Sequence, residues 1–492
     1  MRVVLISSPG LRQLEIYQSI GVRAPPLGLA YIASVLEEAG HKVSIIDAST
    51  LGLSVEETAK MALSNKPDIV GISAVTPTAK GAYSLAKIIK EKDPTLKIVM
   101  GGPHVSFLYT EALTNGADYV VMGEGERTTL ELIEFIESFG DSIEPVNVKG
   151  LAYRDKDGQV KLTAPRPLIR DLDSLPEPAR HLLPMDKYTL FDKPIKIIHV
   201  MASRGCPYGC IYCSTSYFWG RRYRIRSPSK VAEEVERSTE KYRTNIIVFS
   251  DDELTLLPQW VDSFVNEIKS RGLDITFTCG SRVSSVSKEM LIKLKRAGCT
   301  TIYYGIESYK DEDIEKIGKR ITISQAIKAV SWSKEAGIET AGSFILGFPW
   351  QTVEDMEKTI GFSIKLGVDY AQYTVATPYP GTPLYRMAKE NGLIEIYDWD
   401  YYTTVYPVMR GYSFTREEAG KMLKKAYRRF YLRPTFIISQ ARKGRLRTLL
   451  DIVARALKSY ISRNSEETGT NTPKPKERKG QEFDVALLQK AR

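Results

Sequence analysis

The chain has 492 residues, of which 43% are apolar and 26% are charged, and its formal net charge is +10. This composition excludes a globally disordered or fibrous protein, and about one domain per 100–200 residues predicts two or three domains. No apolar run approaches the ~18 residues of a membrane span, and Met1-Arg2 leads directly into a strand-like segment rather than a secretory signal. We therefore expect a cytoplasmic protein.

Residues 1–140 alternate short β-branched runs with amphipathic helical patterns, which predicts a doubly wound (Rossmann-like) α/β domain with a parallel sheet. In such domains ligands bind beyond the carboxyl ends of the strands. Small and polar residues at those ends leave room for a large planar or phosphate-bearing ligand, although they suit tight turns equally well. The expected strands are Val3–Ser7, Val43–Asp47, Ile69–Ser73, Ile98–Met100 and Tyr119–Met122, with helices at Leu27–Gly40, Ala79–Lys92 and Arg127–Phe139. The strand-end candidates for ligand binding are Ser73, Thr76, Gly101, Gly102, His104, Gly123 and Gly125.

Residues 141–194 are expected to connect two domains. Asp157-Gly158 is typical of a hairpin turn and lies between two short strand-like runs. Five prolines between Pro165 and Pro184 then favour an extended chain.

Residues 195–400 show a second strand–helix alternation. Six units over about 200 residues favour a partial (β/α)6 barrel of the TIM type over a closed eight-stranded one, with any active site at the carboxyl ends of its strands. The expected strands are Ile197–Met201, Ile246–Ser250, Thr276–Cys279, Thr301–Ile306, Thr340–Gly347 and Tyr370–Thr377. The expected helices are Lys230–Tyr242, Pro258–Arg271, Ser287–Ala297, Ser324–Ala336 and Val353–Leu366.

Residues 401–463 are expected to form a helical module. Thr415 and Glu418 make a capping box for a helix that Pro434 ends, and an apolar stripe from Leu446 to Ile461 predicts a second helix. Residues 421–463 hold thirteen basic residues and a single acid, Asp451, so the rest of the chain is close to neutral. Residues 464–492 are polar without periodicity and are expected to be disordered.

Three of the five cysteines follow one another with the spacing C-x-x-x-C-x-x-C, at Cys206, Cys210 and Cys213. In a reducing compartment such clustering indicates metal or redox chemistry. A structural zinc site usually draws two separated ligand pairs, and neither Cys279 nor Cys299 has a partner nearby to complete one. Three thiolates on a 4Fe-4S cluster would leave one iron open to a substrate or cofactor. Cys279 and Cys299 themselves have apolar neighbours and suit a buried structural role.

At this motif the chain resembles the radical S-adenosylmethionine (SAM) superfamily. The resemblance implies that Cys206, Cys210 and Cys213 hold a 4Fe-4S cluster and that SAM chelates the fourth iron. Cleavage of SAM would then give methionine and a 5′-deoxyadenosyl radical, which removes hydrogen from an unactivated carbon. It also implies a role near the adenine for Tyr212, near the ribose for Glu307 and in the fifth-strand motif for Gly347. The implied contacts of the methionine moiety are Asp251, Asp252 and Glu253 for its amine and Arg282 for its carboxylate.

The order of domains resembles the cobalamin-binding branch of this superfamily, whose members include carbon methylases, tetrapyrrole ring cyclases and lipid-modifying enzymes. Four motifs carry that resemblance: Pro25-Pro26-Leu27-Gly28, Asp68–Ser73, Gly101–His104 and Gly123–Glu126. It implies cobalamin as a third cofactor, bound at the strand ends of residues 1–140. The chain lacks the Asp-x-His-x-x-Gly motif that supplies a cobalt ligand elsewhere, so either cobalt lacks that histidine ligand or the domain binds no cobalamin. His104 is either a lower-face ligand or a packing residue of the strand-end loop.

The leading hypothesis is therefore a radical SAM enzyme that methylates, or closes a ring at, an unactivated carbon of a hydrophobic lipid, isoprenoid or tetrapyrrole substrate. A reductase or ferredoxin-type protein would donate electrons. The basic helices with aromatic residues over 421–463 favour docking on an anionic membrane surface, on the inner face of the membrane. Nucleic acid is a disfavoured partner for the same basic residues. In a third interpretation these helices only cap the barrel. Two further hypotheses are an RNA-modifying methylthiotransferase, although residues 1–205 lack the cysteines typical of that group, and a non-catalytic cofactor-binding sensor.

Overall fold

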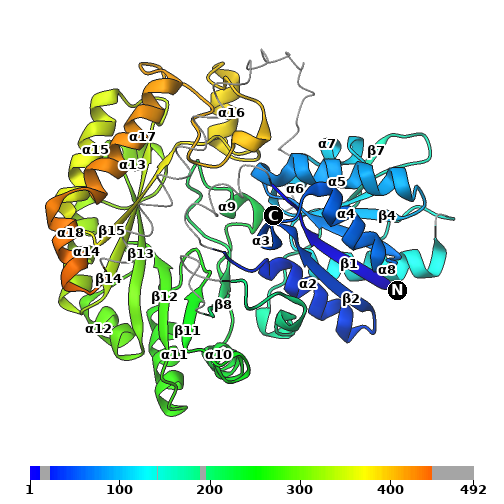
Figure 1. Cartoon of the computed structure of the whole chain (residues 1–492), viewed down its shortest axis with the longest axis horizontal. Coiled ribbons are helices and arrows are strands. Elements are labelled where there is room, and N and C mark those ends of the chain that lie inside the picture. The colour runs from blue at the N-terminus through cyan, green and yellow to red at the C-terminus, as the bar shows by residue number, and fades with distance from the viewer. Residues whose placement is uncertain (11–22, 141, 189–195, 446–492) are drawn as a thin grey trace.

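The computed structural model describes residues 1–10, 23–140, 142–188 and 196–445. Two α/β bodies lie side by side, with the N-terminal one in blue and cyan and the second in green and yellow (Figure 1). The doubly wound domain and the partial barrel predicted from the sequence are both confirmed. The predicted second C-terminal helix at 446–461 and the tail at 464–492 lie outside the described residues.

The N-terminal sheet has seven strands in the order β2-β1-β3-β4-β5-β6-β7, of which β1 to β5 pair in parallel. Alternate side chains of β1 enter two separate cores, because successive residues of a strand face opposite sides. Val4 and Ile6 pack beneath one helical layer, and Val3 and Leu5 beneath the other. The strands are β1 (Arg2–Ser7), β2 (Lys42–Asp47), β3 (Ile69–Ser73), β4 (Lys97–Gly101), β5 (Tyr119–Val121), β6 (Leu151–Arg154) and β7 (Val160–Leu162). The helices are α2 (Leu27–Glu38), α3 (Ala48–Leu51), α4 (Val55–Ser64), α5 (Ala79–Lys92), α6 (Pro103–Phe107), α7 (Tyr109–Thr114) and α8 (Glu126–Phe139), with the 3-10 turn η1 (Thr76–Thr78).

The hairpin expected in the connector belongs structurally to this first sheet. Its strand β6 pairs antiparallel with β5, and β7 pairs with β6. Leu151, Ala152 and Tyr153 are buried against the sheet, which explains the placement: the hairpin shields the otherwise open edge of β5. The extended stretch after it contains the short turns η2 (Leu172–Ser174) and η3 (Arg180–Leu182).

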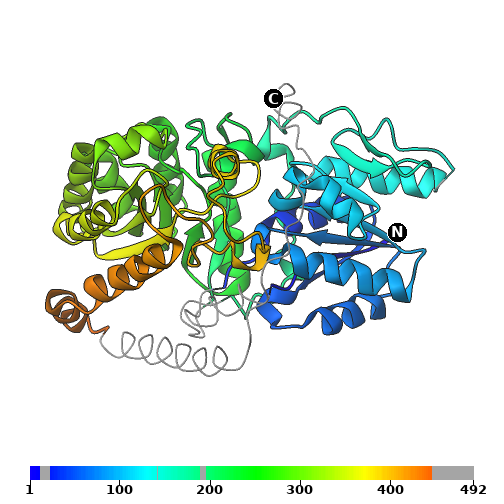
Figure 2. The ribbon, with the colours of Figure 1, turned by 90° about the horizontal axis from the view of Figure 1, so that it is seen from above.

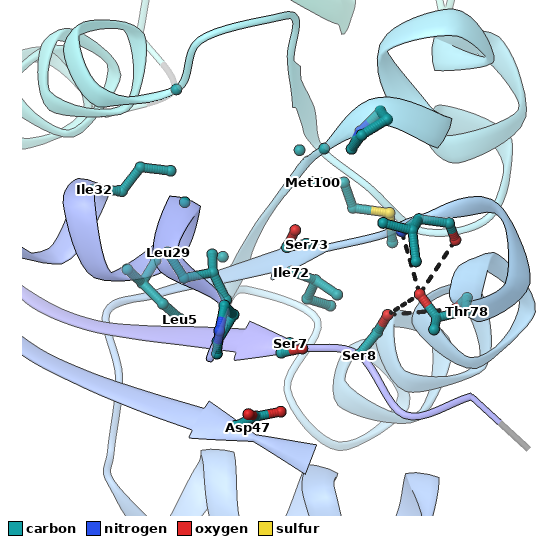
Figure 3. Close-up of a pocket in the computed structure, with 18 of the residues that line it drawn as sticks. Leu5, Ser7, Ser8, Leu29, Ile32, Asp47, Ile72, Ser73, Thr78 and Met100 are labelled. Atoms are coloured by element: carbon teal, nitrogen blue, oxygen red, sulfur yellow. Dashed lines mark hydrogen bonds between the residues drawn. The ribbon is translucent and has the colours of Figure 1, made fainter. Parts of the chain in front are cut away.

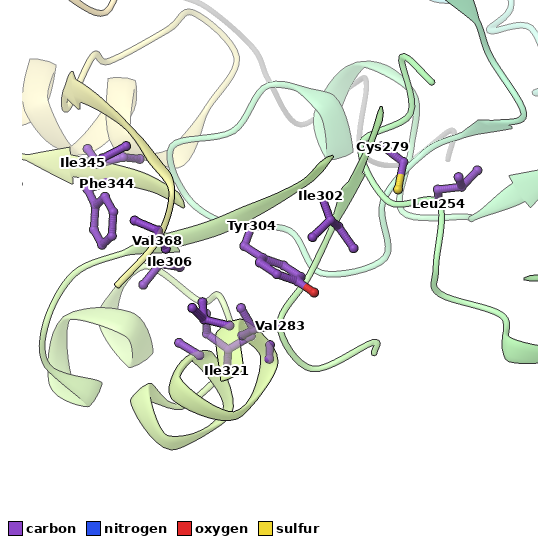
Figure 4. Packing of buried hydrophobic residues seen from close by; sticks show 14 of the residues in the cluster. Leu254, Cys279, Val283, Ile302, Tyr304, Ile306, Ile321, Phe344, Ile345 and Val368 are labelled. Carbon is purple, nitrogen blue, oxygen red and sulfur yellow. The ribbon is translucent and has the colours of Figure 1, made fainter. Parts of the chain in front are cut away.

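The second sheet has six parallel strands in the order β15-β14-β13-β12-β11-β8, so β8 and β15 form its two edges. Ile302, Tyr304 and Ile306 of β13 all face the same side and pack with side chains such as Val283 and Ile321 (Figure 4). The strands are β8 (Ile198–Val200), β11 (Ile246–Phe249), β12 (Thr276–Ser281), β13 (Cys299–Glu307), β14 (Glu339–Leu346) and β15 (Tyr370–Val375). The surrounding helices are α10 (Pro228–Tyr242), α11 (Pro258–Ser270), α12 (Lys288–Arg296), α13 (Asp311–Lys316), α14 (Ile323–Glu335), α15 (Val353–Leu366) and α16 (Pro383–Glu390).

The C-terminal helices cover the β15 edge of this sheet. Helix α17 (Arg416–Tyr431) begins at the predicted capping box, and α18 (Pro434–Arg442) follows it; both lie along the outside of the yellow strands (Figure 2). The hydroxyl of Tyr431 donates to the carbonyl oxygen of Ala371 at 2.7 Å and accepts from its N–H at 3.1 Å, and Tyr427 bonds Tyr373 in the same way. The described part of the basic module therefore caps the barrel. None of the described helices is long and apolar enough to cross a membrane.

Candidate active site

The three clustered cysteines lie on a tight loop after β8. A two-residue ribbon, β9 (Ser203–Arg204) paired with β10 (Arg224–Ile225), closes the base of this loop, and helix α9 (Thr215–Phe218) follows the last cysteine. The hydroxyl of Ser216 donates to the carbonyl oxygen of Cys206 at 3.0 Å, and the N–H of Ile211 donates to Ile317 at 3.0 Å. These bonds hold the cysteine loop at the mouth of the barrel.

The donor set of this loop fits an iron–sulfur cluster. Cys206, Cys210 and Cys213 are free thiols, and Cys210 is buried. Burial raises the pKa of Cys213 to about 11, and a coordinated metal ion would lower the pKa of this thiol. Across the described residues, no three His, Cys, Asp or Glu side chains converge on one metal ion. Cys279 and Cys299 are buried in the barrel core, as expected, and Cys279 lies beside Leu254 (Figure 4).

The three acidic residues after β11 have different surroundings. Asp251 accepts hydrogen bonds from the backbone N–H of Ala202 at 3.2 Å and of Ser203 at 2.5 Å, so it anchors the strand that leads into the cysteine loop. Glu253 accepts from the N–H of Arg282 at 2.7 Å. Burial raises the pKa of Asp251 and that of Glu253 to about 6 each. Asp252 is exposed to solvent and accepts a bond from the hydroxyl of Thr215 at 3.2 Å, and its negative charge acts on Cys206 and Cys213, where it raises the pKa of both thiols in addition to burial.

Glu307 occupies a strained position at the end of β13. Its φ of 71° is left-handed, and the pairing with β14 shifts register beside it. Its Oε1 accepts bonds from the hydroxyl of Tyr212 at 2.9 Å and the Nζ of Lys319 at 2.5 Å, whereas its buried Oε2 has no partner in the described structure. Burial and the Glu307 carboxylate raise the pKa of Tyr212, so the phenol stays protonated and donates. An acceptor beside the cysteine loop is thus left free for a ligand hydroxyl.

Lys319 is the residue of this site that the sequence analysis missed. It is buried three residues after α13, and its carbonyl oxygen accepts a bond from Arg282. The Arg282 guanidinium also lies 3.4 Å from the ring centroid of Tyr208, and its Nε has no partner in the described structure. The sequence carries no signal for Lys319 beyond a basic pair after a glycine, because its role depends on a chain reversal that brings it back to β13.

Gly347 directly follows β14 and lies in a loop held by Gln351. The Gln351 side-chain oxygen accepts from the N–H of Gly347 at 2.9 Å and of Phe348 at 3.0 Å, and its amide donates to Asp313 at 2.7 Å. Phe348 lies between Tyr212 and Trp350, with ring centroids 5.9 Å and 5.3 Å away. Gly347 therefore shapes the aromatic wall next to Tyr212.

A cavity of about 430 Å³ opens at the carboxyl ends of the N-terminal strands. Figure 3 shows Ser7, Asp47 and Ser73 at these ends, with Leu29 and Ile32 of α2 facing them across the space. Of the predicted ligand-binding residues, Ser73, Gly101, Gly102, Gly123 and Gly125 line the cavity. Phe218 and Trp219 of the second body line it too, so the cavity reaches the segment that follows Cys213.

Thr76 and His104 are not among the lining residues of this cavity. The Thr76 hydroxyl lies 3.2 Å from Nδ1 of His104, whose ring packs 6.2 Å from that of Tyr83 and 5.1 Å from that of Trp399. Burial lowers the pKa of His104 to about 3, so the imidazole is neutral. His104 is therefore a buried ring that packs against Tyr83 and Trp399, outside the lining of the cavity.

Comparisons with known proteins agree with both bodies. The B12 binding domain family matches residues 16–133, and the Radical SAM superfamily matches residues 200–363. An uncharacterized methyltransferase of Pyrococcus horikoshii is 42% identical over 91% of this chain and 98% of its own length. The anaerobic magnesium-protoporphyrin IX monomethyl ester cyclase of Rubrivivax gelatinosus is 30% identical over 90% of this chain and 81% of its own length.

Two solved structures share the fold. The cobalamin-dependent SAM radical enzyme OxsB with aqua-cobalamin bound covers 94% of this chain and 72% of its own, with a TM-score of 0.72 and 18% identity. The radical SAM methyltransferase TsrM of Kitasatospora setae, with cobalamin and a [4Fe-4S] cluster bound, covers 79% of this chain and 75% of its own, with a TM-score of 0.64 and 19% identity. The relatives are methyltransferases and cyclases, so the chain is an enzyme and the hypothesis of a non-catalytic sensor is not supported. The chain therefore belongs to the cobalamin-binding branch of the radical SAM superfamily, enzymes whose cofactors are a 4Fe-4S cluster, SAM and cobalamin.

Proposed function

We propose that this enzyme forms a carbon–carbon bond at an unactivated carbon of a hydrophobic substrate, by transfer of a methyl group. The observation that carries the proposal is the shared wall of the two sites: Phe218 and Trp219 line the N-terminal cavity and follow Cys213 by only a few residues. A corrinoid in that cavity would therefore lie next to the radical-generating site. The similarity to the Pyrococcus protein, which is described as a methyltransferase, supports the same reaction class.

In this proposal the cysteine loop and the barrel mouth hold the cluster and SAM. Cys206, Cys210 and Cys213 would bind three irons. The free Oε2 of Glu307 would accept a ribose hydroxyl, and the free Nε of Arg282 would donate to the methionine carboxylate. Asp252 would take the methionine amine, while Asp251 and Glu253 act by fixing the loops on either side of it. Bound together, the three cofactors supply reductive cleavage of SAM, hydrogen abstraction and methyl delivery.

The remaining residues would shape the two cavities. Tyr212 and the wall formed beside Gly347 would contact the adenine. Ser73, Gly101, Gly102, Gly123 and Gly125 would contact the corrinoid. Thr76 and His104 would act one step away, by fixing the loop that follows β4.

Ring closure is the second candidate reaction, because the Rubrivivax relative is a cyclase that acts on a tetrapyrrole. The two reactions separate in one experiment. The chain is reconstituted with iron and sulfide without oxygen, reduced with SAM present, and assayed for 5′-deoxyadenosine with and without methylcobalamin. A Cys206→Ala variant is the control.

Mass spectrometry of lipid and tetrapyrrole extracts then identifies the outcome. Methylation adds one methylene per event and requires cobalamin, whereas ring closure removes hydrogens. Production of 5′-deoxyadenosine no higher than in Cys206→Ala would contradict both reactions.

We also propose that a reductase or ferredoxin-type protein donates the electrons. We propose further that the enzyme docks peripherally on an anionic membrane through α18 and the residues just before it. Leu432, Ile437 and Ile438 are exposed by 56%, 38% and 51%, next to the basic Arg442. Tyr427 and Tyr431 are committed to β15 and do not take part. An Ile437→Ser/Ile438→Ser variant should sediment less with phosphatidylglycerol vesicles than the wild type; equal sedimentation would contradict the proposal.

A further inference from the structure

Four buried charged side chains join the two bodies next to the cavity. Arg204, which precedes the cysteine loop, donates to Oε1 of Glu124 at 3.1 Å and to Oε1 of Glu126 at 2.6 Å. Arg224 of β10 donates to the same oxygen of Glu124 at 2.7 Å. All four side chains are no more than 7% exposed. Two arginines of the barrel body thus form ion pairs with two glutamates of the Gly123–Glu126 segment, so the two positive and two negative charges balance.

The two glutamates differ in how completely they are bonded. Glu124 uses both oxygens, because its Oε2 accepts the N–H of Ile169 at 2.8 Å. Glu126 uses only Oε1, and its buried Oε2 has no partner in the described structure. Buried polar atoms of native proteins are nearly always hydrogen-bonded. Glu126 also lines the cavity, so a ligand there can supply the missing donor.

We propose that Glu126 is a direct contact of the corrinoid, in which Oε2 accepts a hydrogen bond from the primary amide N–H of one of the three propionamide side chains (b, d or e) on the rim of the corrin ring. This assignment rests on the cavity being the cobalamin site. A carboxylate in this position repels the phosphate of the nucleotide loop and any carboxylate on the ring, so it selects a neutral amide donor. Oε1 of the same residue bonds Arg204, two residues before Cys206, so Glu126 links the corrinoid to the cluster loop.

The test uses corrinoids in which one ring amide is hydrolysed to a carboxylate. Aquacobalamin and its b-, d- and e-monocarboxylates are titrated by absorbance into the full-length chain with its cluster reconstituted. The wild type should bind one of the three monocarboxylates on the order of a hundredfold more weakly than cobalamin, because two carboxylates then face each other without water. It should bind the other two nearly as well as cobalamin.

Glu126→Gln should remove this discrimination. A glutamine supplies both an acceptor for the amide and a donor for a carboxylate, so the disfavoured monocarboxylate should bind within about threefold of cobalamin. The matched control is Glu124→Gln, which removes one charge from the same network and should keep the discrimination of the wild type. Equal discrimination in Glu126→Gln and the wild type overturns the proposal.

The wild type alone also decides the matter if the variant does not fold. A wild type that binds all three monocarboxylates as well as cobalamin overturns the proposal without any variant. Failure of cobalamin itself to bind would instead contradict the assignment of the cavity. The readout is binding and does not depend on turnover.

Discussion

The conformation of Gly205 gives the sharpest quantitative test of the cysteine loop. Its φ is 90°, and a Cβ placed there would lie 2.3 Å from the carbonyl oxygen of Arg222, two residues before strand β10. For Gly205→Ala the left-handed backbone costs about 1–2 kcal/mol and the overpacking about 1–3 kcal/mol, so the loss of stability should reach about 2–5 kcal/mol. The variant should also bind less iron, because relief of the contact moves the backbone next to Cys206.

Gly367→Ala is the matched control in the same body. Gly367 has a similar φ of 76°, but a Cβ there meets no atom within 4 Å. It isolates the backbone term and should cost only about 1–2 kcal/mol, with normal iron content. The assay is urea unfolding of the cluster-free chain under reducing conditions, followed by iron analysis after anaerobic reconstitution. Equal unfolding free energies for the two variants would refute the argument from the close contact with Arg222.

Three further predictions concern other parts of the molecule. Tyr431→Phe should lower the unfolding free energy by about 1–3 kcal/mol, because the backbone N–H and carbonyl of Ala371 lose their partner; Tyr412→Phe, at an exposed tyrosine, should change little in the same urea titration. Glu307→Gln should slow 5′-deoxyadenosine formation by about tenfold or more at fixed SAM, whereas the exposed Glu312→Gln should not, and equal rates would contradict the role of Glu307. Burial raises the pKa of Asp251 to about 6. Between about pH 4 and pH 6 the carboxyl group is therefore protonated in the folded chain but ionised in the unfolded chain. The contribution of Asp251 to the free energy of unfolding consequently falls as the pH rises through this range. The unfolding free energy of the wild type relative to Asp251→Asn should therefore drop by on the order of 2–3 kcal/mol across that range, and a flat difference would be inconsistent with the raised pKa.

The sequence predicted the two sheets because their strands are nearly continuous apolar runs. Val3–Ile6 and Ile69–Ile72 are buried on both faces, and that pattern is diagnostic of a parallel sheet covered by helices. The hairpin β6–β7 was recognised from its turn, but its attachment to β5 was not. Pairing between segments thirty residues apart depends on which sheet edge is open, and no local pattern records that.

Residues of the site were predictable from the sequence only where they are close together in the chain and form a recognisable motif. Cys206, Cys210 and Cys213 are local in sequence, and the strand-end glycines follow recognisable strands. Lys319 was not predictable, because a chain reversal brings it back to its partner Glu307. The free oxygen of Glu126 was not predictable either, because the partner of its other oxygen, Arg204, lies more than seventy positions away. The basic module shows the same limit. Its charge pattern is compatible with a membrane surface, whereas Lys425 and Arg429 pair with Glu357 of α15, and Lys443 pairs with Glu339 and Asp369.

Two separate sets of contacts join the N-terminal body to the rest of the chain. In the first set Arg204 joins the cysteine loop to Glu124 and Glu126. In the second, Trp399 packs against His104 and its indole N–H donates to Glu111 at 2.9 Å, while Lys80 pairs with Asp398 at 3.0 Å. The first set of contacts is buried and the second is partly exposed, so the second should open first.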